Sequence, residues 1–187
     1  MKAGGHMFTK KEIFSIPNVL CYFRILLVPV FLYFYVNGYH LTSAFILLVS
    51  SLSDFLDGYI ARHYNMITEL GSLIDPIADK LTQLVVACTL VYTYPAYLWM
   101  IIIIFLKDGM LLFVGWFIYR RTREHLKQAE MPGKIATAVF FMVSIILIAC
   151  HPNPFFACLA IYLTVGLMVI AMVYYGFGLY HLYNDNK

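Results

Sequence analysis

Residues 54–79 of this 187-residue chain are DFLDGYIARHYNMITELGSLIDPIAD, and they place four aspartates in otherwise apolar surroundings. A long apolar segment precedes this stretch from Leu41, and another follows it as far as Val91. About 20 apolar residues are needed for a helix to cross a bilayer. We therefore expect residues 54–79 to join two membrane helices.

The composition of the whole chain agrees with a membrane protein. Hydrophobic residues make up 62% of the chain and charged residues 12%, and the mean hydropathy is +0.79. These values exclude a disordered chain and an ordinary water-soluble globule, and unbroken apolar runs exclude an outer-membrane barrel. A net charge of +3 is too small to indicate a nucleic-acid partner.

The sequence predicts a single all-α domain over residues 1–187, a polytopic membrane protein with six transmembrane helices. We interpret residues 1–6 as a cloning remnant before a native start near Met7, and expect no cleavable signal peptide. The six expected spans are Asn18–Val36, Leu41–Ile60, Gly71–Val91, Trp99–Tyr119, Ile135–Cys150 and Phe156–Leu179.

Lys and Arg gather in the loops that six spans would place on one side of the membrane. These residues are Lys10, Lys11, Arg62, Arg120, Arg121, Arg123, Lys127 and Lys134. The opposite loops, around residues 37–40, 92–97 and 151–154, contain no Lys or Arg. Since positive charge accumulates in short cytoplasmic loops, both termini are predicted to be cytoplasmic.

The four aspartates of the quoted stretch are costly inside membrane helices. An ionised carboxylate facing lipid costs several kcal/mol unless it has a partner, and such a residue is functional by default. Structural ion pairs are the competing interpretation, but the two nearby cations, Arg62 and Lys80, leave an acidic excess. A divalent cation would neutralise it, and carboxylate oxygens favour Mg²⁺, Mn²⁺ or Ca²⁺.

Helical periodicity places the aspartates and several small residues on shared faces. These are Asp54, Asp57, Gly58 and Ala61 on the second helix, and Gly71, Asp75 and Asp79 on the third. Glycine there lets another helix or the phosphates of a ligand approach the backbone closely. We therefore expect a large anionic ligand, bound near the lipid headgroups.

The four cysteines, Cys21, Cys88, Cys150 and Cys158, are scattered among apolar residues without CxxC spacing. This pattern favours small buried packing residues over a metal site or a disulfide framework.

The spacing Asp54-x-x-Asp57-Gly58-x-x-Ala61-Arg62, eight residues, then Gly71-x-x-x-Asp75-x-x-x-Asp79 resembles the signature of the CDP-alcohol phosphotransferase family. All eight fixed residues are present. Ile16-Pro17-Asn18 with Arg24, and Asp75-Pro76-Ile77-Ala78-Asp79-Lys80-Leu81, resemble the branch of phosphatidylglycerophosphate and cardiolipin synthases.

The resemblance implies transfer of a phosphatidyl group from CDP-diacylglycerol to an alcohol, with release of CMP, by a homodimer in the cytoplasmic membrane. It implies that Asp54, Asp57 and Asp75 hold two divalent cations, Mg²⁺ or Mn²⁺. Asp79 would complete the second metal site and act as general base. Asp54, Gly58, Ala61, Arg62 and Gly71 would bind CDP-diacylglycerol.

The resemblance also suggests an acceptor site. Lys107 stands where related synthases have an arginine facing the acceptor, although Lys107-Asp108 could instead be a structural pair. Gly133-Lys134-Ile135-Ala136-Thr137 resembles the Gly-Lys-x-Lys-Thr motif of phosphatidylglycerophosphate synthases, with Ala136 in place of the second lysine. Arg120 and Arg121 could assist, or simply bind anionic headgroups.

We expect glycerol 3-phosphate as the acceptor. Phosphatidylglycerol, which would give cardiolipin, and an inositol phosphate are alternatives. A divalent-cation transporter and a non-catalytic lipid-binding protein are rivals from other classes. Clustering of the aspartates toward one membrane face argues against the transporter, and the complete set of four argues against the non-catalytic protein.

Overall fold

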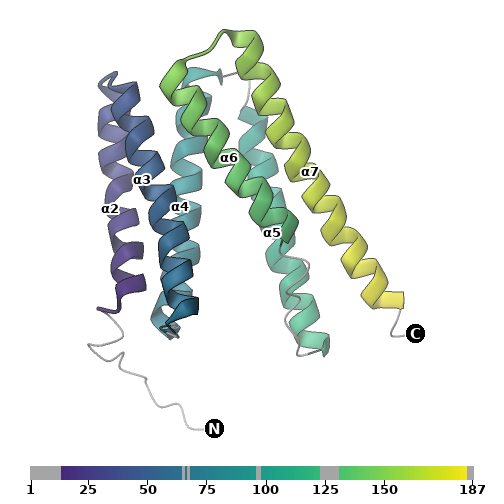
Figure 1. The fold of residues 1–187 in the computed structure, drawn as a ribbon. Coiled ribbons are helices and arrows are strands. Elements are labelled where there is room, and N and C mark those ends of the chain that lie inside the picture. Colours follow the sequence, from purple (N-terminus) through teal and green to yellow (C-terminus); the bar gives the residue numbers. More distant parts are fainter. Residues whose placement is uncertain (1–13, 65, 67, 96–97, 123–130, 185–187) are drawn as a thin grey trace. The chain divides into compact units, whose positions relative to one another are not determined.

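The computed structural model describes residues 14–64, 66, 68–95, 98–122 and 131–184, and within these residues the regular structure consists of long α-helices (Figure 1). They are α2 (Ile16–Val36), α3 (His40–His63), α4 (Glu69–Thr93), α5 (Leu98–Thr122), α6 (Met131–Cys150) and α7 (Pro154–Asn184). Each of the six spans expected from the sequence lies inside one of these helices. The all-helical prediction is therefore confirmed.

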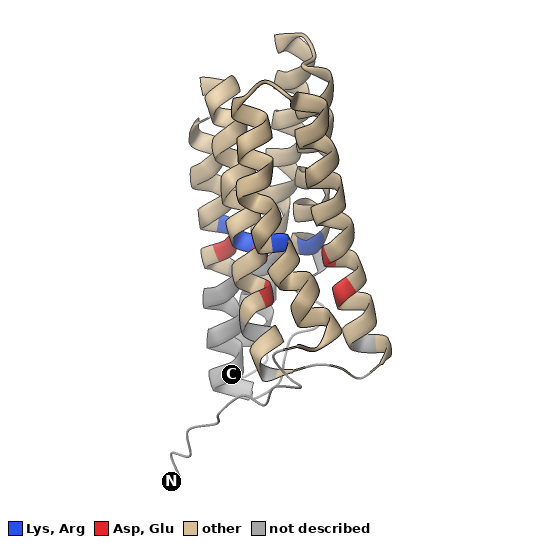
Figure 2. Cartoon of the chain, turned by 90° about the vertical axis from the view of Figure 1, so that its left-hand side faces the viewer, with Lys and Arg blue, Asp and Glu red and all other residues tan. Residues whose placement is uncertain are grey.

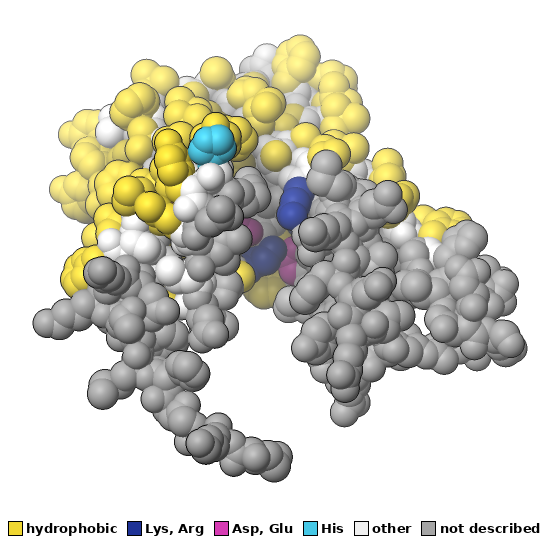
Figure 3. Space-filling view, turned by 60° about the horizontal axis from the view of Figure 1, so that its bottom comes forward, with side chains coloured by type: hydrophobic (Ala, Val, Ile, Leu, Met, Phe, Trp, Pro, Cys, Tyr) yellow, Lys and Arg dark blue, Asp and Glu magenta, His cyan; other side chains and the backbone are white. Residues whose placement is uncertain are grey.

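Four stretches are long and apolar enough to cross a membrane: Ile16–Val36, His40–Ala61, Gly133–Cys150 and Pro154–Tyr174. The helices α4 and α5 have 25 residues each and contain the charged dipeptides Asp79-Lys80 and Lys107-Asp108. Many large hydrophobic side chains point outward, and yellow hydrophobic atoms cover much of the described outer surface in Figure 3. Such a surface suits lipid rather than water, so the chain is an integral membrane protein.

The chain divides into two compact units, Met1–Val86 and Ala87–Lys187, called here the N-terminal and C-terminal units. The N-terminal unit contains α2, α3 and most of α4, and α2 packs along α3. In the C-terminal unit, α7 packs against both α5 and α6. The four aspartates of the quoted stretch all belong to the N-terminal unit.

The turn between α2 and α3 is built on Gly38, whose φ is +82°. Its N–H donates to the carbonyl of Tyr35 at 3.0 Å, and the N–H of Tyr39 donates to the carbonyl of Phe34 at 2.9 Å. This pair of bonds is a Schellman motif, which ends a helix with a left-handed residue, usually glycine. The rings of Phe34 and Tyr39 complete it, with centroids 6.0 Å apart. The motif turns the chain back so that α3 can lie along α2.

The buried face of α2 changes character along its length. It consists of Pro17, Asn18, Cys21, Arg24, Val28, Phe31 and Tyr35. The half near the Schellman turn is apolar, and the half at the start of α2 is polar. In Figure 2 the helices of the N-terminal unit carry their charged residues away from that turn. The polar half positions the candidate site.

The cysteines fit the packing prediction only in part. Cys21 is buried, Cys158 is half-buried, and Cys88 and Cys150 are exposed, so the expectation that all four are buried was wrong. A thiol can face lipid at little cost because it behaves as a small hydrophobe.

Candidate active site

A buried arginine lies at the centre of the acidic residues. The side chain of Arg24, on α2, is 2% exposed. Its Nη1 lies 2.6 Å from Oδ1 of Asp54 and 3.4 Å from Oδ1 of Asp75, and its Nη2 donates to Oδ2 of Asp57. One guanidinium thus contacts three carboxylates from α3 and α4, a geometry that suits its fork of donors.

This role of Arg24 was not predicted from the sequence, where Arg62 and Lys80 were taken as the cations near the aspartates. A signal was present, since an arginine inside the apolar helix Ile16–Val36 is itself costly and needs an acidic partner. The expectation that Arg62 and Lys80 are the cations near the carboxylates is therefore corrected. Arg24 offsets part of their charge.

A negative excess nevertheless remains among the described side chains. Asp79 lies 3.9 Å from the Nζ of Lys80, so Arg24 and Lys80 are the two cations set against four carboxylates. Two negative charges are left over. This balance fits one divalent cation, or more if an anionic ligand binds as well.

The carboxylates differ in exposure. The side chain of Asp57 is 5% exposed, whereas those of Asp54 and Asp75 are 49% and 50% exposed and that of Asp79 is 30% exposed. Arg24 therefore anchors one carboxylate in the interior, while three others keep oxygens that a ligand can reach.

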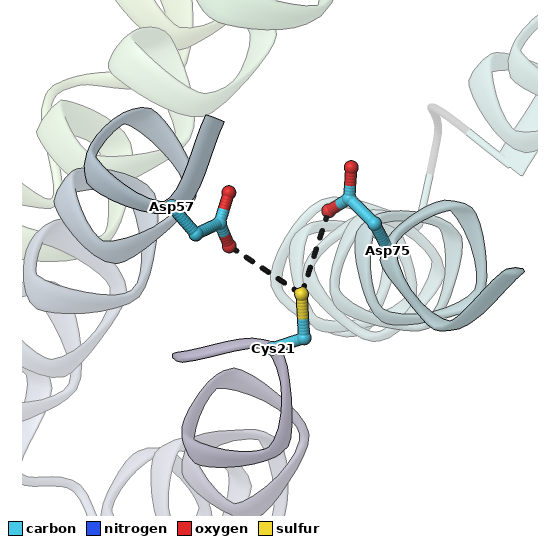
Figure 4. A group of neighbouring side chains, drawn as sticks. All are labelled: Cys21, Asp57 and Asp75. Carbon is cyan, nitrogen blue, oxygen red and sulfur yellow. Dashed lines mark hydrogen bonds between the residues drawn. The ribbon is translucent and has the colours of Figure 1, made fainter. Parts of the chain in front are cut away.

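Cys21 joins this cluster from α2. Its Sγ lies 3.5 Å from Oδ2 of Asp57 and 3.9 Å from Oδ1 of Asp75 (Figure 4). One ligand atom from each of the three residues lies within 4.8 Å of the others, so they form a group that could hold a metal ion. Cys21 is therefore more than a packing residue.

The donor chemistry of the group fits a divalent cation. Two oxygens bound to the same Mg²⁺ at 2.0–2.1 Å are at most about 4.2 Å apart, so Asp57 and Asp75 need only small shifts to share an ion. A hard cation prefers carboxylate oxygen to sulfur. Asp57 and Asp75 are thus the metal-ligating candidates, and Cys21 supplies a weak thiol donor to them.

Gly71 lies against α2 rather than beside open space. A Cβ atom added to Gly71 would overlap Oδ1 of Asn18 and come within 2.9 Å of Oγ1 of Thr68. Thr68 Oγ1 donates to Oδ1 of Asn18 at 3.1 Å and accepts from the N–H of Gly71 at 3.0 Å. The side chain of Asn18 therefore occupies the space beside this glycine.

The structure gives less detail on five other predicted site residues, which lie in both units. Gly58 and Ala61 are half-buried on α3, one turn apart. The side chains of Arg62, Arg120 and Arg121 lie outside the described part of the chain.

The predicted acceptor residues Lys107 and Lys134 belong to the C-terminal unit. Lys107, on α5, is buried, and its Nζ donates to Oγ1 of Thr137 at 2.8 Å and lies 3.2 Å from Oδ1 of Asp108. Thr137 in turn donates to the carbonyl of Gly133 at 3.0 Å. Lys134, on α6, is exposed. In the segment Gly133–Thr137, which resembles the Gly-Lys-x-Lys-Thr motif, Thr137 is therefore a hydrogen-bond partner of Lys107.

Comparison with known proteins gives a family match over most of the chain. The model of the family described as CDP-alcohol phosphatidyltransferase matches residues 14–175. A CDP-diacylglycerol–glycerol-3-phosphate 3-phosphatidyltransferase of Bacillus subtilis is 30% identical over 180 residues, with 84% of this chain and 91% of that protein covered.

Two further relatives match shorter parts. A protein of the same name from Rickettsia bellii is 42% identical over 80 residues, with 41% of this chain and 42% of that protein covered. A cardiolipin synthase (CMP-forming) of Streptomyces coelicolor is 36% identical over 133 residues, with 67% of this chain and 61% of that protein covered. The chain thus spans about two fifths of the length of the Rickettsia relative.

Proposed function

The chain belongs to the CDP-alcohol phosphatidyltransferase family, and from that premise we propose that it transfers a phosphatidyl group from CDP-diacylglycerol to glycerol 3-phosphate. CMP is released and phosphatidylglycerol phosphate is formed. The observation that carries this proposal is the gathering of Asp54, Asp57 and Asp75 around one buried arginine, with negative charge to spare. The relative from Bacillus subtilis bears the name of this activity.

In the proposed site, Asp54, Asp57 and Asp75 hold two divalent cations, Mg²⁺ or Mn²⁺, and Asp79 completes the second site. When bound, the cations neutralise the diphosphate of the donor and stabilise the entering and leaving oxygens. Asp57 is the most rigid of these ligands, because it is buried and bonded to Arg24.

Asp79 is the proposed general base. It takes the proton of the acceptor hydroxyl while that oxygen forms a bond to the phosphorus of the phosphatidyl group. The bond from this phosphorus to the bridging oxygen breaks, and CMP leaves with the electron pair. Asp79 is 30% exposed, so an acceptor hydroxyl can reach it.

The remaining residues of the motif bind the substrates in this proposal. Asp54, Gly58, Ala61, Arg62 and Gly71 contact CDP-diacylglycerol, and a guanidinium such as that of Arg62 suits phosphate oxygens. The residues proposed for the acceptor phosphate are Lys107, Lys134, Arg120 and Arg121.

The proposed setting is the cytoplasmic membrane. Six spans would place both termini and the active site on the cytoplasmic side, where the basic loops lie. A homodimer is proposed as well, because a helical protein with so many exposed apolar side chains can bury one face against its copy.

Phosphatidylglycerol is a second candidate acceptor, which would make cardiolipin. The observation in its favour is Ala136, which stands in place of the second lysine of the Gly-Lys-x-Lys-Thr motif. Ala136 is 1% exposed. A buried methyl group there removes a cation from the acceptor motif. The Streptomyces relative is named a cardiolipin synthase.

One experiment separates the two candidates. Purified protein with CDP-diacylglycerol and Mg²⁺ or Mn²⁺ is offered each acceptor in turn, and CMP release is measured. We expect release with glycerol 3-phosphate. Release with phosphatidylglycerol alone would assign cardiolipin formation, and no release with any alcohol would overturn phosphatidyl transfer.

A further inference from the structure

Cys21 belongs to the candidate metal group, yet it has no part in the proposed phosphatidyl transfer. It is 3% exposed, and its Sγ lies 3.5 Å from Oδ2 of Asp57 and 3.9 Å from Oδ1 of Asp75. The three side chains come from α2, α3 and α4, and Figure 4 shows the thiol pointing toward both carboxylates. Together they form a donor set that mixes sulfur with oxygen.

The spacing of these donors matches a tetrahedral zinc site. Zn²⁺ binds thiolate sulfur at about 2.3 Å and carboxylate oxygen at about 2.0–2.2 Å. Two such ligands at the tetrahedral angle are about 3.6 Å apart. The distances from the Sγ of Cys21 to the two carboxylate oxygens, 3.5 and 3.9 Å, lie on either side of this value. Both sulfur–oxygen separations therefore already suit one shared zinc ion.

The sulfur atom distinguishes between the cations that this group can take. Mg²⁺ and Mn²⁺ are hard cations that use carboxylate oxygens and water, so a thiol adds little to their binding. Zn²⁺ takes both thiolate and carboxylate ligands. When zinc binds, the S–H bond of Cys21 breaks, its electron pair forms the bond from sulfur to zinc, and the proton passes to the solvent.

The charges around Cys21 also suit a zinc ion. A Cys21 thiolate, Asp57 and Asp75 carry three negative charges between them. Zn²⁺ supplies two positive charges, and Arg24, which contacts both carboxylates, supplies a third. The side chain of Asp75 is half exposed, so a cation can reach the group from that side.

We propose that Cys21, Asp57 and Asp75 form a zinc-binding site in which the Cys21 thiolate is a ligand. Asp57 and Asp75 are also the ligands proposed for Mg²⁺ or Mn²⁺, so zinc excludes those cations from them. Zn²⁺ is then an inhibitor of the phosphatidyl transfer, and Cys21 sets the sensitivity to it. The inference rests on the proposed metal-dependent transfer and deepens it, because it names a cation that competes for the same site.

The first test measures the displacement of Mn²⁺ by Zn²⁺ without substrate, followed by electron paramagnetic resonance. Cys21→Ser replaces the thiol by a hydroxyl group, which is a poor zinc ligand. Each half-displacing concentration is converted to a zinc dissociation constant with the Mn²⁺ affinity of the same protein. We expect this constant to rise by about tenfold or more in Cys21→Ser. Cys158→Ser is the matched control, since it changes a half-buried cysteine outside the group, and it should match the original protein.

The second test detects the sulfur ligand directly with Co²⁺, which takes the same kinds of ligand as zinc. A cobalt–thiolate bond gives a charge-transfer absorption band in the near ultraviolet. We expect this band in the original protein and in a triple variant that combines Cys88→Ser, Cys150→Ser and Cys158→Ser, and we expect its loss in Cys21→Ser. The triple variant keeps Cys21, so this test decides the matter even if Cys21→Ser does not fold.

Three results would overturn the proposal. They are equal zinc dissociation constants for the original and Cys21→Ser proteins, the absence of the cobalt–thiolate band from the triple variant, or CMP release that continues at Zn²⁺ concentrations that displace the Mn²⁺. The binding measurements need no turnover, so a failure of phosphatidyl transfer is seen separately. It would appear as an original protein that binds zinc through Cys21 but releases no CMP with Mg²⁺ or Mn²⁺ and any alcohol.

Discussion

The two units of the protein each bury a basic side chain in an apolar helix, and they compensate its charge differently. Arg24 contacts three carboxylates, two of them about half exposed. Lys107 contacts the carboxylate of Asp108 and the hydroxyl of Thr137. Among the described side chains named here, the first cluster has more carboxylates than cations, whereas Lys107 and Asp108 balance each other in formal charge.

This difference teaches that a buried charge in a membrane helix is not by itself a binding site. Both clusters meet the cost of burying a cation, and each does so with an acidic partner. What distinguishes the Arg24 cluster is the excess of accessible carboxylates. An ammonium group has three donors, so Lys107 can contact an acceptor phosphate beside its bond to Thr137 or in exchange for it.

The largest contrast is expected from the same substitution in each cluster. Asp79→Asn should lower turnover by about a thousandfold, because the amide has nearly the same size but neither takes a proton nor binds a metal well. Asp108→Asn should lower turnover by less than about tenfold, since Asp108 pairs with Lys107 and has no proposed part in the reaction. CMP release at saturating metal measures both, and near-normal turnover of Asp79→Asn would remove Asp79 as the base.

The helices were predictable because a membrane span can be recognised from one continuous apolar segment of the sequence. Each long apolar run must satisfy its own backbone hydrogen bonds, so it forms a helix whatever its neighbours do. The carboxylates were predictable as a group for the same reason, since their spacing places them on two helix faces.

The partners of these residues were not predictable, because they depend on how helices pack. Arg24 lies 30 residues before Asp54 and 51 before Asp75, and the rotation of α2 relative to α3 and α4 decides whether it faces them. The place of Asn18 beside Gly71 depends likewise on the approach of α4 to α2. Periodicity within one helix carries no information about either contact.

A second prediction concerns the cation of the first cluster. Arg24→Gln removes a positive charge beside the carboxylates, so the site should attract a divalent cation more strongly while the fold loses stability. We expect a lower half-saturating Mn²⁺ concentration, by about threefold or more, and a lower Tm. Arg24→Lys keeps the charge and should leave the Mn²⁺ affinity closer to the original. Weaker Mn²⁺ binding by Arg24→Gln than by Arg24→Lys would mean that Arg24 chiefly holds the metal-ligating carboxylates in position.

A third prediction separates structure from binding in the second cluster. Lys107→Met leaves Asp108 without its lysine, which typically costs about 3–5 kcal/mol for a buried pair. Adding Asp108→Leu should recover most of the lost thermal stability. The KM for glycerol 3-phosphate should stay raised in the double variant if Lys107 also binds the acceptor. A KM that recovers together with the Tm would leave Lys107 a structural role alone.

The smallest effect is expected at the exposed Lys134. Lys134→Ala should raise the KM for glycerol 3-phosphate by about three- to tenfold, because one solvent-exposed contact to a phosphate is lost. The KM for CDP-diacylglycerol and the Tm should change little. An equal rise of both KM values would place Lys134 outside the acceptor site.

The most direct test of the central claim is Mn²⁺ binding to the purified protein without substrate, followed by electron paramagnetic resonance. The claim is that the carboxylates around Arg24 hold divalent cations. We predict saturable binding by the original protein, a loss of affinity of about a hundredfold or more in Asp57→Asn and Asp75→Asn, and unchanged binding in Asp108→Asn. Equal Mn²⁺ affinity in the original protein and in Asp57→Asn would contradict the account.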